Sequence, residues 1–184
     1  DNPGDPQSGT RQVAFTRDLY IDAEDFSSCP PPKYFRLKPD GEVRLMGAYI
    51  VRCKDVEYDA DGGIKKIICT ADLESGNGMP ADGRKVKGTI HWVSADECFR
   101  ADVHVFDKLF TIENTGAIPE GQSFDDYLNR DSVKVIKNAA MEKSLEASQP
   151  GDRFQFVRTG YFCRDTKDPS VFNRIVELKD SKPF

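Results

Sequence analysis

Short runs of alternating polar and apolar residues, interrupted by turn-forming residues about every 8–12 positions, constrain this chain most strongly. Alternation places every second side chain on one face of a strand, which is the pattern of half-buried β-strands. Three prolines at 30–32 can continue neither a helix nor a strand ladder. The pattern predicts an all-β fold of small barrels or sandwiches. We expect only a few short helices, at 23–28, 123–128 and 141–148.

The bulk composition is that of a globular protein. The 184 residues, 38% of them hydrophobic, suffice for one ordinary domain or two small ones. No apolar run approaches the roughly 20 residues that cross a bilayer. The acidic, Pro- and Gly-containing start is unlike a signal peptide. We therefore expect no membrane partner.

Five cysteines are present, and no pair has the spacing of metal ligands. Most of them fall in apolar or aromatic runs, which favours buried, reduced thiols in a cytoplasmic protein. A redox or metal role is the alternative.

The charge pattern predicts a local anion-binding surface. The net charge of −5 argues against indiscriminate binding of nucleic acid. Residues 33–54 nevertheless contain six Lys or Arg against two acidic residues, a local balance of 6 − 2 = +4. A second cationic group, Arg84, Lys85 and Lys87, precedes the strand that carries the only tryptophan. Cations beside an aromatic strand suit a polyanion.

Motifs for catalysis are absent from the sequence. We find no Gly-rich phosphate loop, nucleophile elbow or zinc-binding His-Glu-x-x-His helix. His91 and His104 are the only imidazoles, and His91 in a strand suggests a structural role. Acidic neighbours such as Asp125 and Asp126 suit a surface. We predict no catalytic residue and no metal site, with a β-fold hydrolase as the alternative.

Arginine and glutamine side chains on predicted hairpins are candidates for RNA recognition. Arg36 and Arg44 flank a Pro-Asp-Gly turn, and Gln155 and Arg158 follow one another on a later strand. A guanidinium suits phosphates and base edges, and a carboxamide can read a Watson–Crick edge. The alternative is that these are ordinary solubilising residues.

Several short sequence motifs, by their order and spacing, resemble the C-terminal region of class I glutamyl- and glutaminyl-tRNA synthetases. The similarity covers roughly residues 10–180, and the words at 160–163 and 172–174 favour the glutaminyl branch. The words that carry the resemblance are 11–15, 19–26, 42–45, 48–49, 81–88, 90–94, 154–156, 160–163 and 171–174.

The resemblance implies two small β-barrels of a type shared with a ribosomal protein family. Residues 1–10 would be a flexible leader. A proximal barrel would combine 11–30 with 102–184, and its first strand would lie upstream of this chain. A distal barrel would comprise 31–101. The three prolines and the segment 95–99 are candidate crossing points between the barrels.

The resemblance also implies that the barrels clasp the anticodon loop of tRNA-Gln. Arg36 matches a residue that meets the third anticodon base, and Arg44 one that meets the first. Gln155 matches the reader of the central uridine, with Arg158 near that pocket. Phe35 and Met46 stand where the family usually has basic residues. As possible contacts to the RNA backbone we add Lys33, Arg84, Lys85 and Lys87.

The catalytic domain of the family lies upstream in the same polypeptide and uses ATP with Mg²⁺ to attach glutamine to tRNA. The resemblance therefore implies a cytoplasmic, anticodon-binding fragment that holds no cofactor and is inactive alone. Two alternatives remain: the equivalent domain of a glutamyl-tRNA synthetase, and a free-standing β-barrel that binds ribosomal RNA.

Overall fold

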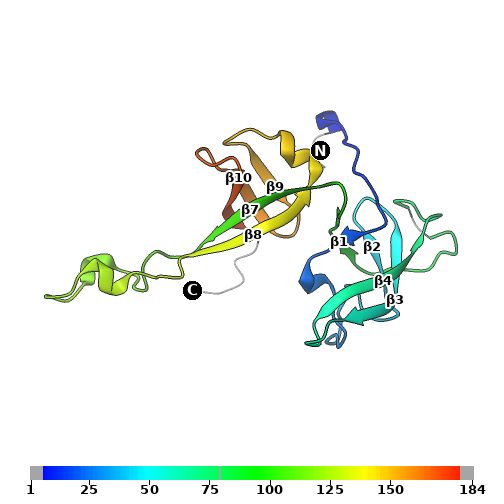
Figure 1. The fold of residues 1–184 in the computed structure, drawn as a ribbon, viewed down its shortest axis with the longest axis horizontal. Helices are drawn as coiled ribbons and strands as arrows, with labels where there is room; N and C mark the ends of the chain where they lie inside the picture. The colour runs from blue at the N-terminus through cyan, green and yellow to red at the C-terminus, as the bar shows by residue number, and fades with distance from the viewer. Residues whose placement is uncertain (1–5, 79, 179–184) are drawn as a thin grey trace. The chain divides into compact units, whose positions relative to one another are not determined.

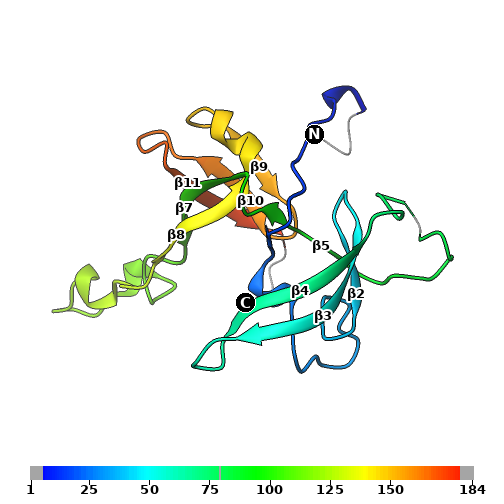
Figure 2. The ribbon, with the colours of Figure 1, turned by 45° about the vertical axis from the view of Figure 1, so that its right-hand side comes forward.

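Two β units, one ending at Glu97 and the other beginning at Cys98, make up the structure. It is a computed structural model that describes residues 6–78 and 80–178. Figures 1 and 2 show that strands dominate both units. All helices in the described ranges are short 3-10 turns. The prediction of an all-β fold with two β units is confirmed.

In the first unit, a four-stranded sheet has the order β4-β3-β2-β5, and β1 pairs with β6 apart from it. Strand β2 runs antiparallel to β3 and parallel to β5, which brings residues 42–45 and 89–90 side by side. The elements of this unit are η1 (Pro6–Ser8), β1 (Leu19–Tyr20), η2 (Ala23–Asp25), β2 (Glu42–Leu45), β3 (Ile50–Tyr58), β4 (Ile64–Asp72), β5 (Thr89–Ile90) and β6 (Val93–Ser94).

The core of the first unit follows from the alternation of its strands. Val43 and Leu45 point inward from β2, while Ile90 from β5 is fully buried. Trp92 completes the cluster and donates its Nε1–H to the carbonyl of Met46 at 2.9 Å. This core supports the loops on either side of β2.

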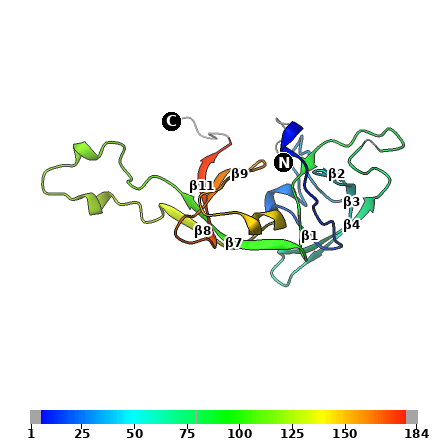
Figure 3. The same ribbon diagram turned by 90° about the horizontal axis from the view of Figure 1, so that it is seen from above.

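The second unit is a five-stranded sheet with the order β8-β7-β11-β10-β9, in which β11 and β7 are parallel. The excursion between β7 and β8 extends away from this sheet (Figure 3). Its elements are β7 (Cys98–Phe106), η3 (Thr115–Ala117), η4 (Phe124–Tyr127), β8 (Val133–Glu142), η5 (Lys143–Ala147), β9 (Arg153–Phe156), β10 (Gly160–Arg164) and β11 (Val171–Glu177).

Aromatic rings fill the second core. Phe162 and Phe172 are almost completely buried, and the ring of Phe156 stacks on Phe162 with centroids 4.3 Å apart. The guanidinium of Arg164 lies 5.9 Å from the ring centroid of Phe172 and donates to the carbonyl of Pro169. The face of β9 opposite these rings is left to solvent.

The three expected helices occur as 3-10 turns, namely η2, η4 and η5. Ser123 caps η4 through its side chain, and Asp126 reciprocates by accepting from the Ser123 backbone N–H. Extended backbone follows at Leu128, so the turn does not grow into a longer helix.

Residues 19–26 form strand and core contacts inside the first unit, whereas the prediction groups 11–30 with 102–184. Leu19 pairs with Ser94, while Phe26 forms a bridge to Leu37 and joins the first core. Strand pairing and apolar burial therefore hold this segment beside 31–97. The predicted break at 101/102 would fall inside β7. Residues 1–5 of the predicted leader lie outside the described residues.

The cysteine prediction was partly wrong. Only Cys53 is buried, and burial raises the pKa of its thiol; Cys29 and Cys69 are exposed. Cys69 lies on β4, most of whose residues are exposed on both faces. No helix within the described ranges has the length and apolar character needed to span a membrane.

Candidate nucleic-acid interface

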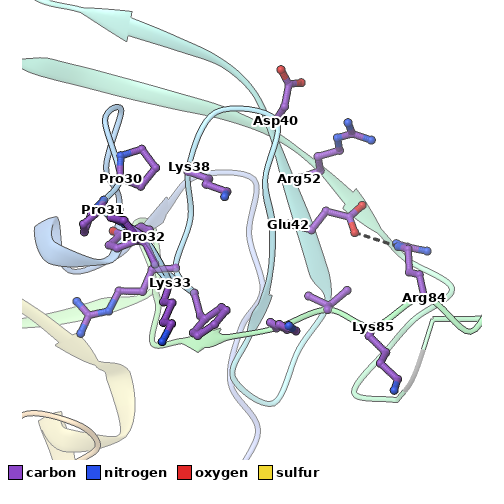
Figure 4. Close-up of a pocket in the computed structure, with 15 residues that line it drawn as sticks. Pro30, Pro31, Pro32, Lys33, Lys38, Asp40, Glu42, Arg52, Arg84 and Lys85 are labelled. Atoms are coloured by element: carbon purple, nitrogen blue, oxygen red, sulfur yellow. Dashed lines mark hydrogen bonds and ion pairs between the residues drawn. The ribbon is translucent and has the colours of Figure 1, made fainter.

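A cationic pocket of about 860 Å³ opens on the first unit (Figure 4). Its wall contains seven Lys or Arg residues against two carboxylates, so the local charge opposes the acidic net charge of the chain. The volume is in the range of small-molecule sites. The lining residues are Pro30, Pro31, Pro32, Lys33, Tyr34, Phe35, Arg36, Lys38, Asp40, Glu42, Arg52, Arg84, Lys85, Val86 and Lys87.

Arg36 is fixed in the wall of this pocket by the turn η2. Its Nε lies 3.3 Å from the carboxylate of Asp25, which is only 1% exposed. The same guanidinium donates to the carbonyl of Glu24 at 2.9 Å. A buried carboxylate needs such a partner, because an uncompensated buried charge is costly. The pairing therefore holds Arg36 in one orientation at the pocket.

Arg84 is neutralised by three carboxylates. Its nitrogens lie 3.0 Å from Glu42, 2.7 Å from Asp72 and 2.8 Å from Asp82. The side-chain hydrogen bond from Arg84 lowers the pKa of Asp72, and its backbone and side-chain hydrogen bonds lower that of Asp82. The three carboxylates raise the pKa of Arg84 in turn. Arg84 thus ties its loop to β2 and the end of β4, as Figure 4 shows for Glu42.

Arg44 lies outside the lining of the pocket. Its guanidinium donates to the carbonyl of Gly76 at 3.1 Å and also to that of Gly78. The backbone N–H of Arg44 donates to the carbonyl of Gly88 at 3.2 Å. The structure therefore places Arg44 against the loop that leads from β4 toward β5, in the same unit as Arg36.

Four of the cations around the pocket have no carboxylate partner among the residues that the structure describes: Lys33, Lys38, Arg52 and Lys85. Lys87 lies with its Nζ 5.5 Å from the ring centroid of Phe35. All five side chains belong to exposed residues. They are the part of the pocket that can attract a polyanion.

Gln155 and Arg158 lie in the second unit, on and beside β9. Gln155 is exposed and opposite Tyr161 in the antiparallel pair of β9 and β10. Tyr161 is 43% exposed and lies opposite Val176 of β11, which is also exposed. The three side chains form a row across the sheet. Arg158 occupies the following turn in the left-handed region, with φ of 69°.

Sequence reasoning missed Tyr161. Residues opposite one another in an antiparallel pair share a face, and the short turn at 157–159 sets Gln155 against Tyr161. The two alternating runs and the short turn between them therefore could have predicted that Gln155 and Tyr161 lie opposite one another. The structure brings Gln155, Tyr161 and Arg158 together in one unit and the other six predicted residues together in the other.

The histidines and the acidic neighbours considered in the sequence lie outside both candidate surfaces. His91 is half-buried, and the ring centroid of His104 lies 6.2 Å from that of Phe106. Across the described residues, no group of three or more His, Cys, Asp or Glu side chains is placed to hold a metal ion. Asp126 serves the cap of η4.

Two family models match the chain, at residues 1–72 and 89–165. Both are described as the anticodon-binding domain of class I tRNA synthetases (E and Q). A glutamine–tRNA ligase of Rhodopirellula baltica is 45% identical over 183 residues, which is 98% of this chain and 30% of the relative. The glutamine–tRNA ligase of Vibrio campbellii is 46% identical over 184 residues, 98% of this chain and 32% of the relative.

The chain thus spans about a third of the length of the curated relatives that it matches. The two matched segments fall one in each β unit over most of their length. The order of the matches agrees with the order of the units along the chain. The chain belongs to the family of anticodon-binding domains of the class I glutamyl- and glutaminyl-tRNA synthetases.

Proposed function

We propose that this chain recognises the anticodon loop of tRNA-Gln on behalf of a glutaminyl-tRNA synthetase. The pocket in the first unit carries the proposal, because it gathers cations that have no carboxylate partner among the described residues, in a chain with a net charge of −5. Proteins read unpaired RNA bases by stacking and by hydrogen bonds to base edges. Phosphate contacts by Lys and Arg supply the attraction.

The contacts in the pocket suggest a different role in RNA binding for each of its cationic residues and for Arg44. Lys33, Lys85 and Lys87 are exposed and suit phosphates. Arg36, oriented by Asp25, offers fixed donors to a base. Arg84 has three carboxylates around it, so we assign it to the shape of the loop rather than to a phosphate. Arg44 supports the same loop through two carbonyl groups.

In the second unit we propose that Gln155 reads the central uridine and that Arg158 contacts the RNA beside it. The side chain of Gln155 forms no hydrogen bond with another described residue, so both its donor and its acceptor remain for a base. The exposed ring of Tyr161 lies next to it on the same face.

The relatives are named glutamine–tRNA ligases, and we propose that the longer protein likewise attaches glutamine to tRNA. We propose that ATP and Mg²⁺ serve a catalytic domain of the same polypeptide, that these 184 residues hold no cofactor and are inactive alone, and that the parent protein acts in the cytoplasm. The equivalent role in a glutamyl-tRNA synthetase is the nearest alternative.

Binding titrations with three RNAs test the proposal. We expect the chain to bind tRNA-Gln more tightly than tRNA-Glu or a ribosomal RNA hairpin, and to lose that preference when the central anticodon uridine is replaced. A preference for tRNA-Glu would favour the glutamyl alternative. Equal or tighter binding of the ribosomal hairpin would refute anticodon recognition.

A further inference from the structure

We propose that Phe35 is a stacking platform for an unpaired base and that Lys87 takes a phosphate of the same nucleotide. The inference rests on the proposed function, since it assumes that the pocket of the first unit receives single-stranded RNA. It adds a base-binding residue at a position where the resemblance leads one to expect a cation.

The exposure of Phe35 is the first observation. The ring is 51% exposed and lines the cationic pocket, while the nearby Phe26 and Leu37 are buried in the core. The chain thus buries these two apolar residues and leaves Phe35 exposed in the pocket. An aromatic ring among cations is the combination that binds single-stranded nucleic acid, because bases stack on the ring and phosphates pair with the cations.

The backbone of Phe35 is held tightly, so the ring has a rigid base. Gly88, with φ of +95°, packs against it: a Cβ at Gly88 would lie 1.7 Å from the carbonyl oxygen of Phe35. Gly88 is itself tied to β2 by accepting a hydrogen bond from the Arg44 N–H. Two residues after Phe35, the N–H of Leu37 donates to the carbonyl of Asp25 at 2.9 Å. A platform fixed in this way loses little entropy when a base stacks on it.

Lys87 supplies the second contact. Its Nζ lies 5.5 Å from the ring centroid of Phe35, within the range of a cation–π interaction. Among the described residues it has no carboxylate partner, whereas Arg84, three positions earlier, has three. A base on the ring would bring its phosphate near this ammonium group. Stacking and charge pairing would then act on one nucleotide.

The test uses the chain as it stands with anticodon stem-loops of tRNA-Gln that carry 2-aminopurine at one of the three anticodon positions. We expect one position to show a fluorescence change on binding. Phe35→Leu should abolish that change and weaken binding about 5-fold to 100-fold, the range for loss of one stacked base. Phe35→Tyr should preserve both the affinity and the signal.

Charge and stacking are separated by two further variants. Phe35→Lys should lose the fluorescence change but steepen the salt dependence of binding by about one unit. Lys87→Ala should lower that dependence by about one unit while keeping the signal. Phe124→Leu, at another exposed phenylalanine in the second unit, is the matched control and should change neither.

Unchanged affinity and fluorescence in Phe35→Leu, with wild-type binding intact, would overturn the role of Phe35 and leave the proposed function standing. Absence of a preference for tRNA-Gln in the wild-type chain would instead refute the proposed function. Thermal unfolding followed by the single tryptophan, Trp92, should be the same in wild type and Phe35→Leu. A loss of binding in Phe35→Tyr as well would also contradict stacking.

Discussion

The candidate surfaces of the two units differ in the kind of side chain that they present. The first unit offers a pocket crowded with cations, of which Lys33 and Lys85 lack a carboxylate partner in the part of the chain described. The second offers the row Gln155, Tyr161 and Val176, which has no charge. The first surface would therefore supply most of the long-range attraction, while the row on the second would contact RNA without charge. An acidic chain can in this way bind RNA locally without binding it everywhere.

The two surfaces are also held in place by different means. In the first unit, carboxylates and carbonyl groups fix the side chains of Arg36, Arg44 and Arg84. In the second, the register between β9 and β10 sets Gln155 against Tyr161 without any ion pair. We therefore expect salt and acid to affect the first surface more strongly than the second.

The largest expected effect comes from the second core. Phe172 is fully buried among other rings, and Phe172→Ala should lower the free energy of unfolding of that unit by about 3–5 kcal/mol. The single tryptophan lies in the first core, so its fluorescence reports that unit alone. Circular dichroism should show an early transition, while the Trp92 transition stays in place. A parallel shift of both would mean that the units do not unfold independently.

Gln155→Ala should weaken binding of tRNA-Gln by about 1–3 kcal/mol, because it removes a two-point contact with one base. Since glutamine carries no charge, the slope of affinity against salt concentration should not change. Gln149→Ala, at a glutamine of the same unit, serves as the control. An unaltered dissociation constant in Gln155→Ala would remove this residue from the site.

Arg44→Ala should weaken binding of tRNA-Gln by an amount comparable to or smaller than the effect of Gln155→Ala. We expect a loss on the order of 1–3 kcal/mol if the guanidinium makes a bidentate contact. The structure gives a second reason for a loss, because Arg44 holds the carbonyl groups of Gly76 and Gly78. Proteolysis of the loop separates the two causes. Faster cleavage within 73–88 would indicate loop support, and weaker binding at unchanged cleavage would indicate direct contact.

Lys85→Ala should lower the salt slope of tRNA binding by about one unit, as expected for one lost phosphate contact. The effect should be uniform across tRNA sequences, in contrast to that of Gln155→Ala. Lys65→Ala, at an exposed lysine of β4 outside the pocket, is the comparison. If Lys85→Ala and wild type show equal salt slopes, Lys85 makes no contact with an RNA phosphate.

The smallest expected effect is a dependence of the first unit on acid. The pKa values of Asp72 and Asp82 are lowered in the folded state, so their contribution is present above the unfolded value of about 3.9 and is lost as pH falls through the lower folded values. At pH values below about 4, the melting temperature of the first unit, followed by Trp92 fluorescence, should therefore decrease. Arg84→Met should flatten this fall, whereas Arg52→Met should retain it.

Much of the architecture could be predicted from local signals. Alternation predicted the strands, and the turn residues predicted the hairpins, such as Asp59 to Gly63 between β3 and β4. Local signals could not predict with which part of the chain residues 11–30 would pack. Leu19 pairs with Ser94 across 75 positions, and a short strand carries too few residues to specify a partner so distant.

The candidate site shows the same division. Residue types alone indicated that Arg36, Lys85 and Gln155 suit RNA, and the resemblance assigned an anticodon base to Arg36 and to Gln155. They did not distinguish Arg84, whose charge is met by three carboxylates, from its neighbour Lys85. Glu42 and Asp72 come from strands far from Arg84 along the chain, so only the folded arrangement reveals their pairing.

The sequence by itself determined that this protein is a β protein of the anticodon-binding family, because strand periodicity and the motifs shared with the family are local properties of the chain. The tertiary structure alone decided which cations keep their charge for a ligand and which rings remain exposed. Those properties depend on carboxylates and glycines brought together by strand pairing, as at Arg84 and at the contact of Gly88 with Phe35. Charge compensation and close packing act through space, so residues distant in the chain, such as Glu42 for Arg84, decide much of both.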